Sequence, residues 1–148
     1  MQTNTTHNQT VDQLNSFLRG ELSAAETYRQ ALSKLPSSSN RTTLEDVARS
    51  HQERAELLTG EVRRLGGEPA ESSGAWGTFA KLITGGAQAF GEKAAISVLE
   101  EGEDHGRNDY RRDLDELEAG ARSLIVQRVV PEQERTHRAM SNLKKSLS

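Results

Sequence analysis

The chain has 148 residues, of which 33% are apolar, 28% are charged and only 4% are aromatic. That composition is lean for a β-sandwich or a doubly wound sheet, but it suits long helices that each bury one apolar stripe. The 19 Lys and Arg residues and the 22 Asp and Glu residues are interspersed and leave a net charge of −3, so no basic surface for nucleic acid is expected. The sequence therefore predicts one all-α domain of ordinary size.

The residue types that are missing restrict the chemistry further. Because the chain has no cysteine, any metal must be held by carboxylates and imidazoles. No run approaches the ~20 apolar residues of a membrane span, so no membrane partner is expected. Residues 1–10 are rich in Thr, Asn and Gln and lack the charged and apolar parts of a signal peptide. We expect them to form a flexible tail of a cytoplasmic protein.

Apolar residues recur at helical spacing over residues 11–35, which predicts a first helix. The Pro- and Ser-rich stretch 36–41 ends it, and either Thr42 or Thr43 can cap the second helix. The sequence Gly-Gly-Glu-Pro at 66–69 is a strong terminator for that second helix.

A third helix carries an apolar stripe from Ile96 to Leu117 and is expected to end around 118–120. A fourth helix follows over residues 124–147. Because Pro131 lies inside this fourth helix, either the helix kinks there or a new helix begins with Pro131 in its first turn.

The lengths of the connections predict the topology. Short links within the first and second pairs of helices make each pair an antiparallel hairpin. The connection over residues 67–91, roughly 25 residues long, is sufficient to return along the whole bundle. The second and third helices should then run parallel, in a four-helix bundle that occupies residues 11–148. We expect Trp76 and Phe79, in this crossover, to plug the side or end of the bundle.

The two hairpins look like an internal repeat with a constant offset of 82 residues. The apolar stripes of the second and fourth helices align at this offset, for example Leu44 with Val126. The first and third helices share a Gly-Glu-x6-Tyr-Arg element followed by a leucine, in the residues Gly20, Glu21, Tyr28, Arg29 and Leu32 and again in Gly102, Glu103, Tyr110, Arg111 and Leu114. The simplest interpretation is a duplicated helical hairpin with pseudo-two-fold symmetry.

Polar residues interrupt the apolar stripes at equivalent places. Glu21 and Glu103 lie within the stripes of the first and third helices, and His51 lies within that of the second. A carboxylate that is buried without a partner costs several kcal/mol, so each glutamate should be protonated, paired or bound to a metal. His137 lies on the stripe of the fourth helix, and Glu134 precedes it by three residues at the edge of the stripe.

These residues resemble the ferritin-like superfamily, in which each of two helices supplies a Glu and each of the other two supplies Glu-x-x-His. The resemblance implies a metal site made of Glu21, His51, Glu103, Glu134 and His137. More narrowly, the chain resembles a bacterial four-helix-bundle family of uncharacterised function, through Glu-Val-Arg-Arg-Leu-Gly-Gly-Glu-Pro (61–69), Trp76, Gly102-Glu103 with Tyr110, and the pair Gln133 and His137.

One position departs from the ferritin-like plan. Ala48 stands three residues before His51, where a di-iron protein has a bridging Glu. The site could therefore hold a single ion, a pair completed by Glu100, or no metal. Fe, Mn or Zn would suit carboxylate and imidazole ligands. Tyr28, Tyr110 and Gln133 are expected beside these ligands, with each tyrosine hydroxyl bonded to a Glu or His of a neighbouring helix.

Two functions follow as alternatives. The first is a ferritin-like protein that binds a divalent metal and handles metal or oxidative stress. The second is a non-catalytic stress or interaction protein whose buried polar network holds no metal. The sequence contains no nucleophile-base pair and no phosphate-binding loop, so it does not decide whether the protein is an enzyme. Helical bundles of this size often dimerise, and a homodimer is a further expectation.

Overall fold

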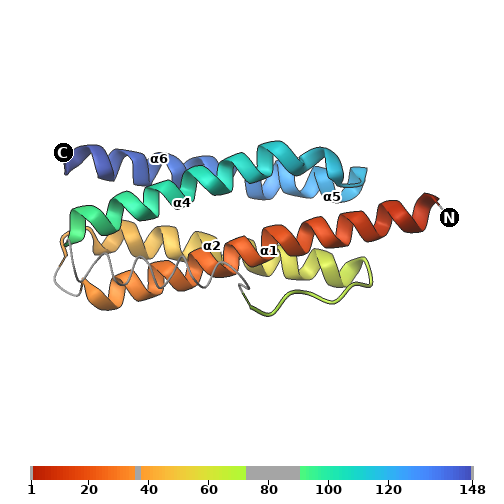
Figure 1. Ribbon diagram of the computed structural model, residues 1–148, viewed down its shortest axis with the longest axis horizontal. Helices are drawn as coiled ribbons and strands as arrows, with labels where there is room; N and C mark the ends of the chain where they lie inside the picture. The colour runs from red at the N-terminus through yellow and green to blue at the C-terminus, as the bar shows by residue number, and fades with distance from the viewer. Residues whose placement is uncertain (1, 36–37, 73–90, 148) are drawn as a thin grey trace.

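The computed structural model describes residues 2–35, 38–72 and 91–147, and every secondary-structure element in these ranges is a helix (Figure 1). The predicted all-α class is thus confirmed for the described residues, whereas Trp76 and Phe79 lie outside them. The elements in chain order are α1 (Gln2–Lys34), α2 (Arg41–Arg64), α4 (Glu92–Asp113), the 3-10 turn η2 (Leu114–Glu116), α5 (Ala119–Leu124), the π-helical segment η3 (Ile125–Val129) and α6 (Val130–Ser146).

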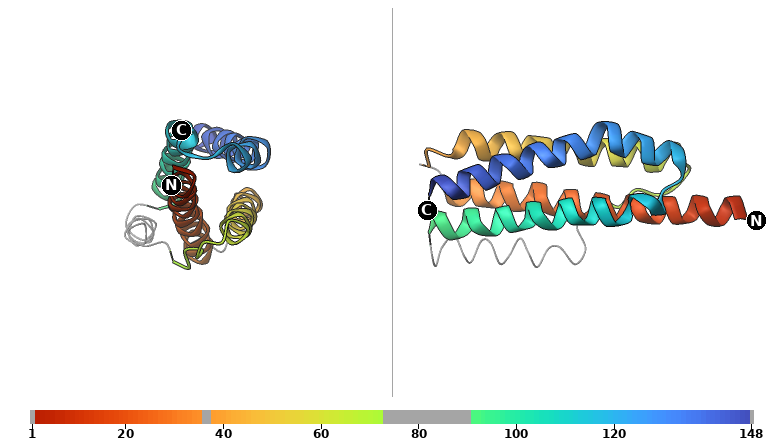
Figure 2. Two further views of the ribbon diagram at one scale, coloured as in Figure 1. Left: turned by 90° about the vertical axis from the view of Figure 1, so that its right-hand side faces the viewer. Right: turned by 90° about the horizontal axis from the view of Figure 1, so that it is seen from above.

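These elements form two long hairpins that lie side by side (Figures 1 and 2). The helices α1 and α2 run antiparallel, and α5, η3 and α6 together form a rod that runs antiparallel to α4. Figure 1 also shows that α2 and α4 run in the same direction, as predicted from the lengths of the connections. Among the described residues, no helix is both long enough and apolar enough to cross a membrane.

The predicted terminator of α2 acts as a Schellman cap. Gly66 has a φ of +80°, and its N–H donates to the carbonyl of Arg63 at 2.9 Å. The N–H of Gly67 donates to the carbonyl of Val62, also at 2.9 Å. This pair of hydrogen bonds satisfies carbonyls that the end of a helix otherwise leaves without partners. The first glycine is needed because a side chain disfavours the left-handed conformation.

The start of α2 differs from the prediction. The helix begins at Arg41, so Thr42 and Thr43 lie inside its first turn and do not cap it. Asn40 occupies the cap position, but its side chain makes no capping hydrogen bond to α2 and donates instead to Glu92 at 3.2 Å. The guanidinium of Arg41 instead reaches back to the end of α1 and donates to the carbonyl of Leu32 at 2.7 Å. Arg41 thus satisfies a free carbonyl of one helix while starting the next.

Residues 2–10, which the sequence predicts to be part of a flexible tail, belong to α1, which begins at Gln2. Thr10 is buried, and its hydroxyl accepts a hydrogen bond from the N–H of Glu118 at 2.8 Å. The two ring nitrogens of His7 lie 2.6 Å from the carbonyl of Leu65 and 3.1 Å from a carboxylate oxygen of Glu118. These contacts with distant parts of the chain explain why a polar segment extends the helix.

The ends of the second hairpin also differ from the predicted boundaries. The helix α4 ends at Asp113, before the predicted boundary at 118–120. The carbonyls of Leu114 and Leu117 accept hydrogen bonds from the Arg122 guanidinium at 3.2 and 2.8 Å, in place of a continued helix.

The rod formed by α5, η3 and α6 contains a π-helical segment, η3, that ends two residues before Pro131. Proline has no N–H to donate to the carbonyl one turn earlier, that of Gln127. The backbone accordingly widens over Ile125–Val129, where the N–H of Val130 donates to the carbonyl of Ile125, five residues back. The helix α6 then begins with Pro131 in its first turn, which is the second of the two predicted alternatives.

Two apolar clusters fill the bundle on either side of a buried polar layer. One cluster contains Leu14, Phe17, Leu18, Ala55, Leu58, Val62, Tyr110, Leu117, Ala121, Ile125 and Val129. The other contains Tyr28, Ala31, Leu44, Val47, Ala95, Ile96, Leu99, Met140 and Leu143. The buried polar side chains between them include Glu21, His51, Arg54 and Glu103.

We expect Gly66→Ala to lower the free energy of unfolding by about 1 kcal/mol, because alanine resists the left-handed conformation. Gly60, inside α2, has no atom within 4 Å of the position a Cβ would take. Because alanine favours a helix more than glycine does, Gly60→Ala should raise the free energy of unfolding by about 0.5–1 kcal/mol. Urea denaturation measures both changes, and effects of the same sign would contradict the assigned cap.

Candidate functional site

The buried polar layer is built around four charged side chains from three helices. Glu21 comes from α1, His51 and Arg54 from α2, and Glu103 from α4, and none is more than 4% exposed. His51 and Arg54 share one face of α2 because they are three residues apart. We call these four residues the central ion cluster.

His51 lies between the two glutamates. Its Nδ1 atom is 2.7 Å from Oε2 of Glu21, and its Nε2 atom is 2.7 Å from Oε2 of Glu103. An ionised carboxylate can only accept hydrogen bonds, so both ring nitrogens must carry a proton. The geometry therefore indicates an imidazolium that donates to two carboxylates at once.

Arg54 supplies the second positive charge. Its Nη1 atom donates to Oε1 of Gln133 at 2.7 Å and lies 3.4 Å from Oε1 of Glu21. Its Nη2 atom donates to the hydroxyl of Thr136 at 2.9 Å, and that hydroxyl donates to Oε1 of Glu103 at 2.6 Å. Arg54 thus contacts Glu21 directly and Glu103 through Thr136.

The electrostatics of the central ion cluster favour the charged forms of Glu21, His51 and Glu103. Burial alone raises the pKa of Glu103, but the neighbouring His51 and Arg54 outweigh it and lower that pKa to about 2. Burial also raises the pKa of Glu21, but the positive charges of Arg54 and His51, in that order of size, lower it below 4.5. Burial lowers the pKa of His51, but the two carboxylates raise it above 6.5. Two positive and two negative charges then leave the cluster neutral.

Two tyrosines complete the hydrogen bonds of the carboxylates. The hydroxyl of Tyr28 donates to Oε2 of Glu103, and the hydroxyl of Tyr110 donates to Oε1 of Glu21, both at 2.9 Å. The predicted bond from each tyrosine hydroxyl to a Glu or His of a neighbouring helix is therefore confirmed, and the partner is a Glu in both cases. Each tyrosine serves the glutamate of the other hairpin, as expected for a duplicated element with pseudo-two-fold symmetry.

The symmetry does not extend to the two cations. At the offset of 82 residues, Gln133 is the counterpart of His51 and Thr136 that of Arg54. Both positive charges of the central ion cluster thus come from the first hairpin. Arg54 and Thr136 were not predicted as site residues. A signal for Arg54 was present in the sequence, because it follows His51 by three residues and precedes Leu58 by four on the apolar stripe of α2.

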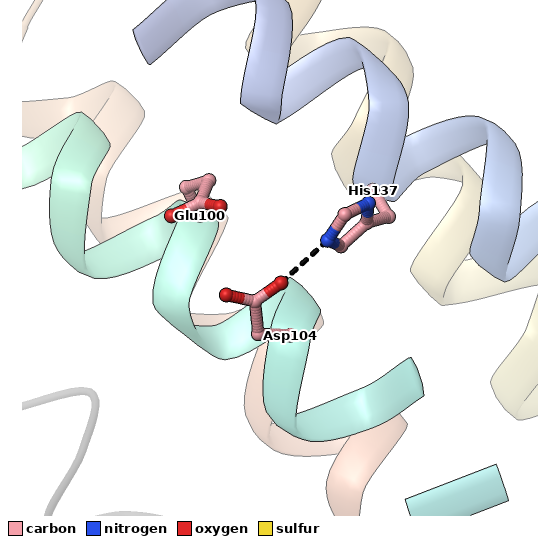
Figure 3. Close-up of side chains that lie close together, drawn as sticks. All are labelled: Glu100, Asp104 and His137. Atoms are coloured by element: carbon pink, nitrogen blue, oxygen red, sulfur yellow. Dashed lines mark hydrogen bonds and ion pairs between the residues drawn. The ribbon is translucent and has the colours of Figure 1, made fainter. Parts of the chain in front are cut away.

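The other predicted metal ligands lie outside the central ion cluster. Glu100 and His137 are half-buried between α4 and α6, where they converge with Asp104 (Figure 3). Glu134 points elsewhere and pairs with Arg111 at 3.1 Å on an exposed face. The structure thus divides the predicted ligands into a central group, Glu21, His51 and Glu103, and a separate group that contains Glu100 and His137.

A cavity of about 260 Å³ reaches the central ion cluster from the side of α1 and α4. Its walls include Gly20, Gly102 and Gly106, whose lack of side chains leaves the space open. Its polar lining residues include Glu21, Tyr28, His51, Glu103, Tyr110 and Gln133. The two glycines that precede the glutamates in the repeated element, Gly20 and Gly102, therefore both border this cavity.

We predict that the stability of the fold passes through a maximum between about pH 4.5 and 6.5. The contribution of His51 is present below the pKa of an unfolded histidine, 6.5, and is lost as the pH rises through its raised folded-state pKa. The contributions of Glu21 and Glu103 are present above 4.5, and each is lost as the pH falls through the lowered folded-state pKa, which is about 2 for Glu103.

The alkaline side of this maximum can be tested by urea denaturation at about pH 5.5 and about pH 8.5. His51→Gln should flatten the decline between these two values. His105→Gln, a control at an exposed position of α4, should retain it. A decline of wild-type size in His51→Gln would show that His51 does not cause it.

Comparison with curated proteins and with solved structures finds no match for the chain. A domain family, described as a domain of unknown function and named DUF2383, matches residues 9–116. The matched region includes all four members of the central ion cluster, whereas Gln133 and Thr136 lie beyond it. Because the match spans well over half of the sequence, the chain belongs to the DUF2383 family.

Proposed function

We propose that the protein is a non-catalytic bundle of ferritin-like type that acts as a stress or interaction protein. In this proposal its buried central ion cluster holds no metal and occupies the place where related bundles bind one. The observation that carries this proposal is the guanidinium of Arg54, which is 1% exposed and lies against the carboxylate of Glu21. The ferritin-like assignment is supported by one buried Glu on each of α1 and α4 and by the common direction of α2 and α4.

The donor set of the central ion cluster does not suit a shared metal ion. A histidine ligates one ion through one ring nitrogen, but the two nitrogens of His51 face different carboxylates. An ion bound by both glutamates would also have to displace the imidazolium and lie near the positive charge of Arg54. Removing one partner from such a buried arrangement costs about 3–5 kcal/mol, so we expect the protein to keep Arg54 in place.

The hydrogen bonding of the central ion cluster also favours a structural role over catalysis. Within the described residues, Arg107 Nε is the buried side-chain polar atom without a partner, and it lies outside the cluster. Burial and the neighbouring carboxylates raise the pKa of Tyr28 and of Tyr110 well above 10, so both stay protonated donors. The two carboxylates, whose pKa values are lowered from 4.5, and the two tyrosine hydroxyls therefore keep their protonation states near neutral pH.

Such a cluster would serve to fix how the helices pack. Charged hydrogen bonds have directional geometry, so a one-turn slip of α1, α2 or α4 would leave a charge unpaired in the core. The outer faces would then be free to bind a partner. A homodimer and a cytoplasmic location belong to the same proposal, and sedimentation and cell fractionation test them.

The first test measures metal content. Tag-free protein is incubated with Fe²⁺, Mn²⁺ or Zn²⁺ and dialysed, and the bound metal is measured by elemental analysis. We expect Glu21→Gln to bind the same amount as the wild type, because Glu21 ligates no metal. A loss of one equivalent in Glu21→Gln, with no loss in the exposed control Glu134→Gln, would overturn the metal-free assignment.

The second test measures the contribution of Arg54 to stability. Arg54→Met should lower the free energy of unfolding by about 3–5 kcal/mol, because it leaves two buried carboxylates with one cation. Arg135→Met is a matched control on α6: Arg135 pairs with Asp46 and Glu132 at the surface, so its loss should cost about 0–1 kcal/mol. Equal effects of the two changes in urea denaturation would contradict the proposal.

A further inference from the structure

The group formed by Glu100, Asp104 and His137 lies outside the central ion cluster, between α4 and α6 (Figure 3). We infer that these three side chains form a binding site for one divalent transition-metal ion, for which Zn²⁺ is a suitable probe. This inference is independent of the metal-free central ion cluster.

The three side chains converge on one point. One potential ligand atom from each lies within 4.8 Å of the other two, and all three residues are half-buried. Around a tetrahedral Zn²⁺ ion with bonds of about 2.0–2.2 Å, neighbouring donor atoms are about 3.4 Å apart. The Asp104 Oδ1 and His137 Nε2 atoms, now 2.5 Å apart, would need to separate by about 0.9 Å, which a change of side-chain rotamer can supply. Half-burial would leave a fourth position for water.

The helices bring these ligands together for a simple geometric reason. Glu100 and Asp104 are four residues apart on α4 and therefore share a face. His137 projects toward that face from α6 in Figure 3. Two carboxylates and a neutral imidazole carry a charge of −2, which matches a divalent cation, and this mixture of oxygen and nitrogen donors suits Zn²⁺, Mn²⁺ or Fe²⁺.

Neighbouring cations distinguish this group from the central ion cluster. Lys144 Nζ lies 3.3 Å from a carboxylate oxygen of Glu100, but the lysine side chain is 47% exposed and can move into water. Arg107 Nη2 is 3.9 Å from Asp104 Oδ1, near the limit of an ion pair. An incoming metal ion would therefore compete with one partly exposed lysine and one distant arginine, whereas in the central ion cluster it would have to compete with the buried Arg54.

The inference is tested on the full-length, tag-free chain by titration with Zn²⁺ in a calorimeter and with Co²⁺ in a spectrophotometer. The wild type should bind one ion per chain, and coordinated Co²⁺ should give a visible absorption band. His137→Ala should weaken binding by at least about tenfold and abolish the band. Lys144→Leu should tighten binding, because it removes a competing cation without adding a ligand.

Two controls make the result decisive. His105→Ala, at an exposed position of the same helix α4, should bind metal like the wild type. Glu21→Gln should also retain the site. If Glu21→Gln failed to bind metal, that result would count against the metal-free central ion cluster and not against this inference.

Circular dichroism checks folding, and Asp104→Asn is a second ligand variant if His137→Ala does not fold. Unchanged binding in a folded ligand variant, or far less than one ion per wild-type chain, overturns the inference.

Discussion

Two carboxylates buried at the centre of a helical core must be neutralised, and the packing of this protein follows from how that is done. Glu21 and Glu103 lie on different hairpins, and His51 joins them by donating to both at 2.7 Å. Arg54 adds the charge that balances the second carboxylate, and it is held in turn by Gln133 and Thr136 of α6. The central ion cluster and its hydrogen-bond partners therefore connect all four rods of the bundle.

The duplicated hairpin provides a symmetric frame for an asymmetric charge arrangement. The exchanged bonds from Tyr28 to Glu103 and from Tyr110 to Glu21 preserve the pseudo-two-fold relation. The second hairpin has neutral Gln133 and Thr136 where the first has His51 and Arg54. A second pair of cations would leave the core with a net charge of +2, which a low-dielectric interior does not tolerate. Neutrality thus explains why the cations occur in only one half.

Burial distinguishes the two groups of histidine and carboxylate side chains to which α4 contributes a carboxylate. Glu103 and Asp104 are adjacent in sequence, yet Glu103 is 2% exposed and bonded to Thr136, whereas Asp104 faces His137 in a half-buried position. In the core, charged partners are fixed because they have no water to replace their bonds. Nearer the surface, Lys144 can leave Glu100 at little cost, which keeps the ligands of the second group available.

Several features of this protein could be predicted from the sequence because they depend on local patterns. The apolar periodicity indicated long helices, the glycines at 66 and 67 indicated the end of α2, and the repeat of Glu and Tyr indicated equivalent buried positions. The bonds between the tyrosines and the glutamates also followed, because a buried hydroxyl and a buried carboxylate each need a partner.

Other features were decided only by tertiary structure. His137 follows Gln133 by four residues on α6, but the packing of the bundle buries Gln133, Thr136 and Met140 and leaves His137 half-buried beside α4, which an angular count along one helix does not show. The helical state of residues 2–10 depends on contacts with Leu65 and Glu118, which are distant in sequence. The role of Arg54 depends on two carboxylates from other helices, since a buried guanidinium is stable only where the fold supplies its counter-charges.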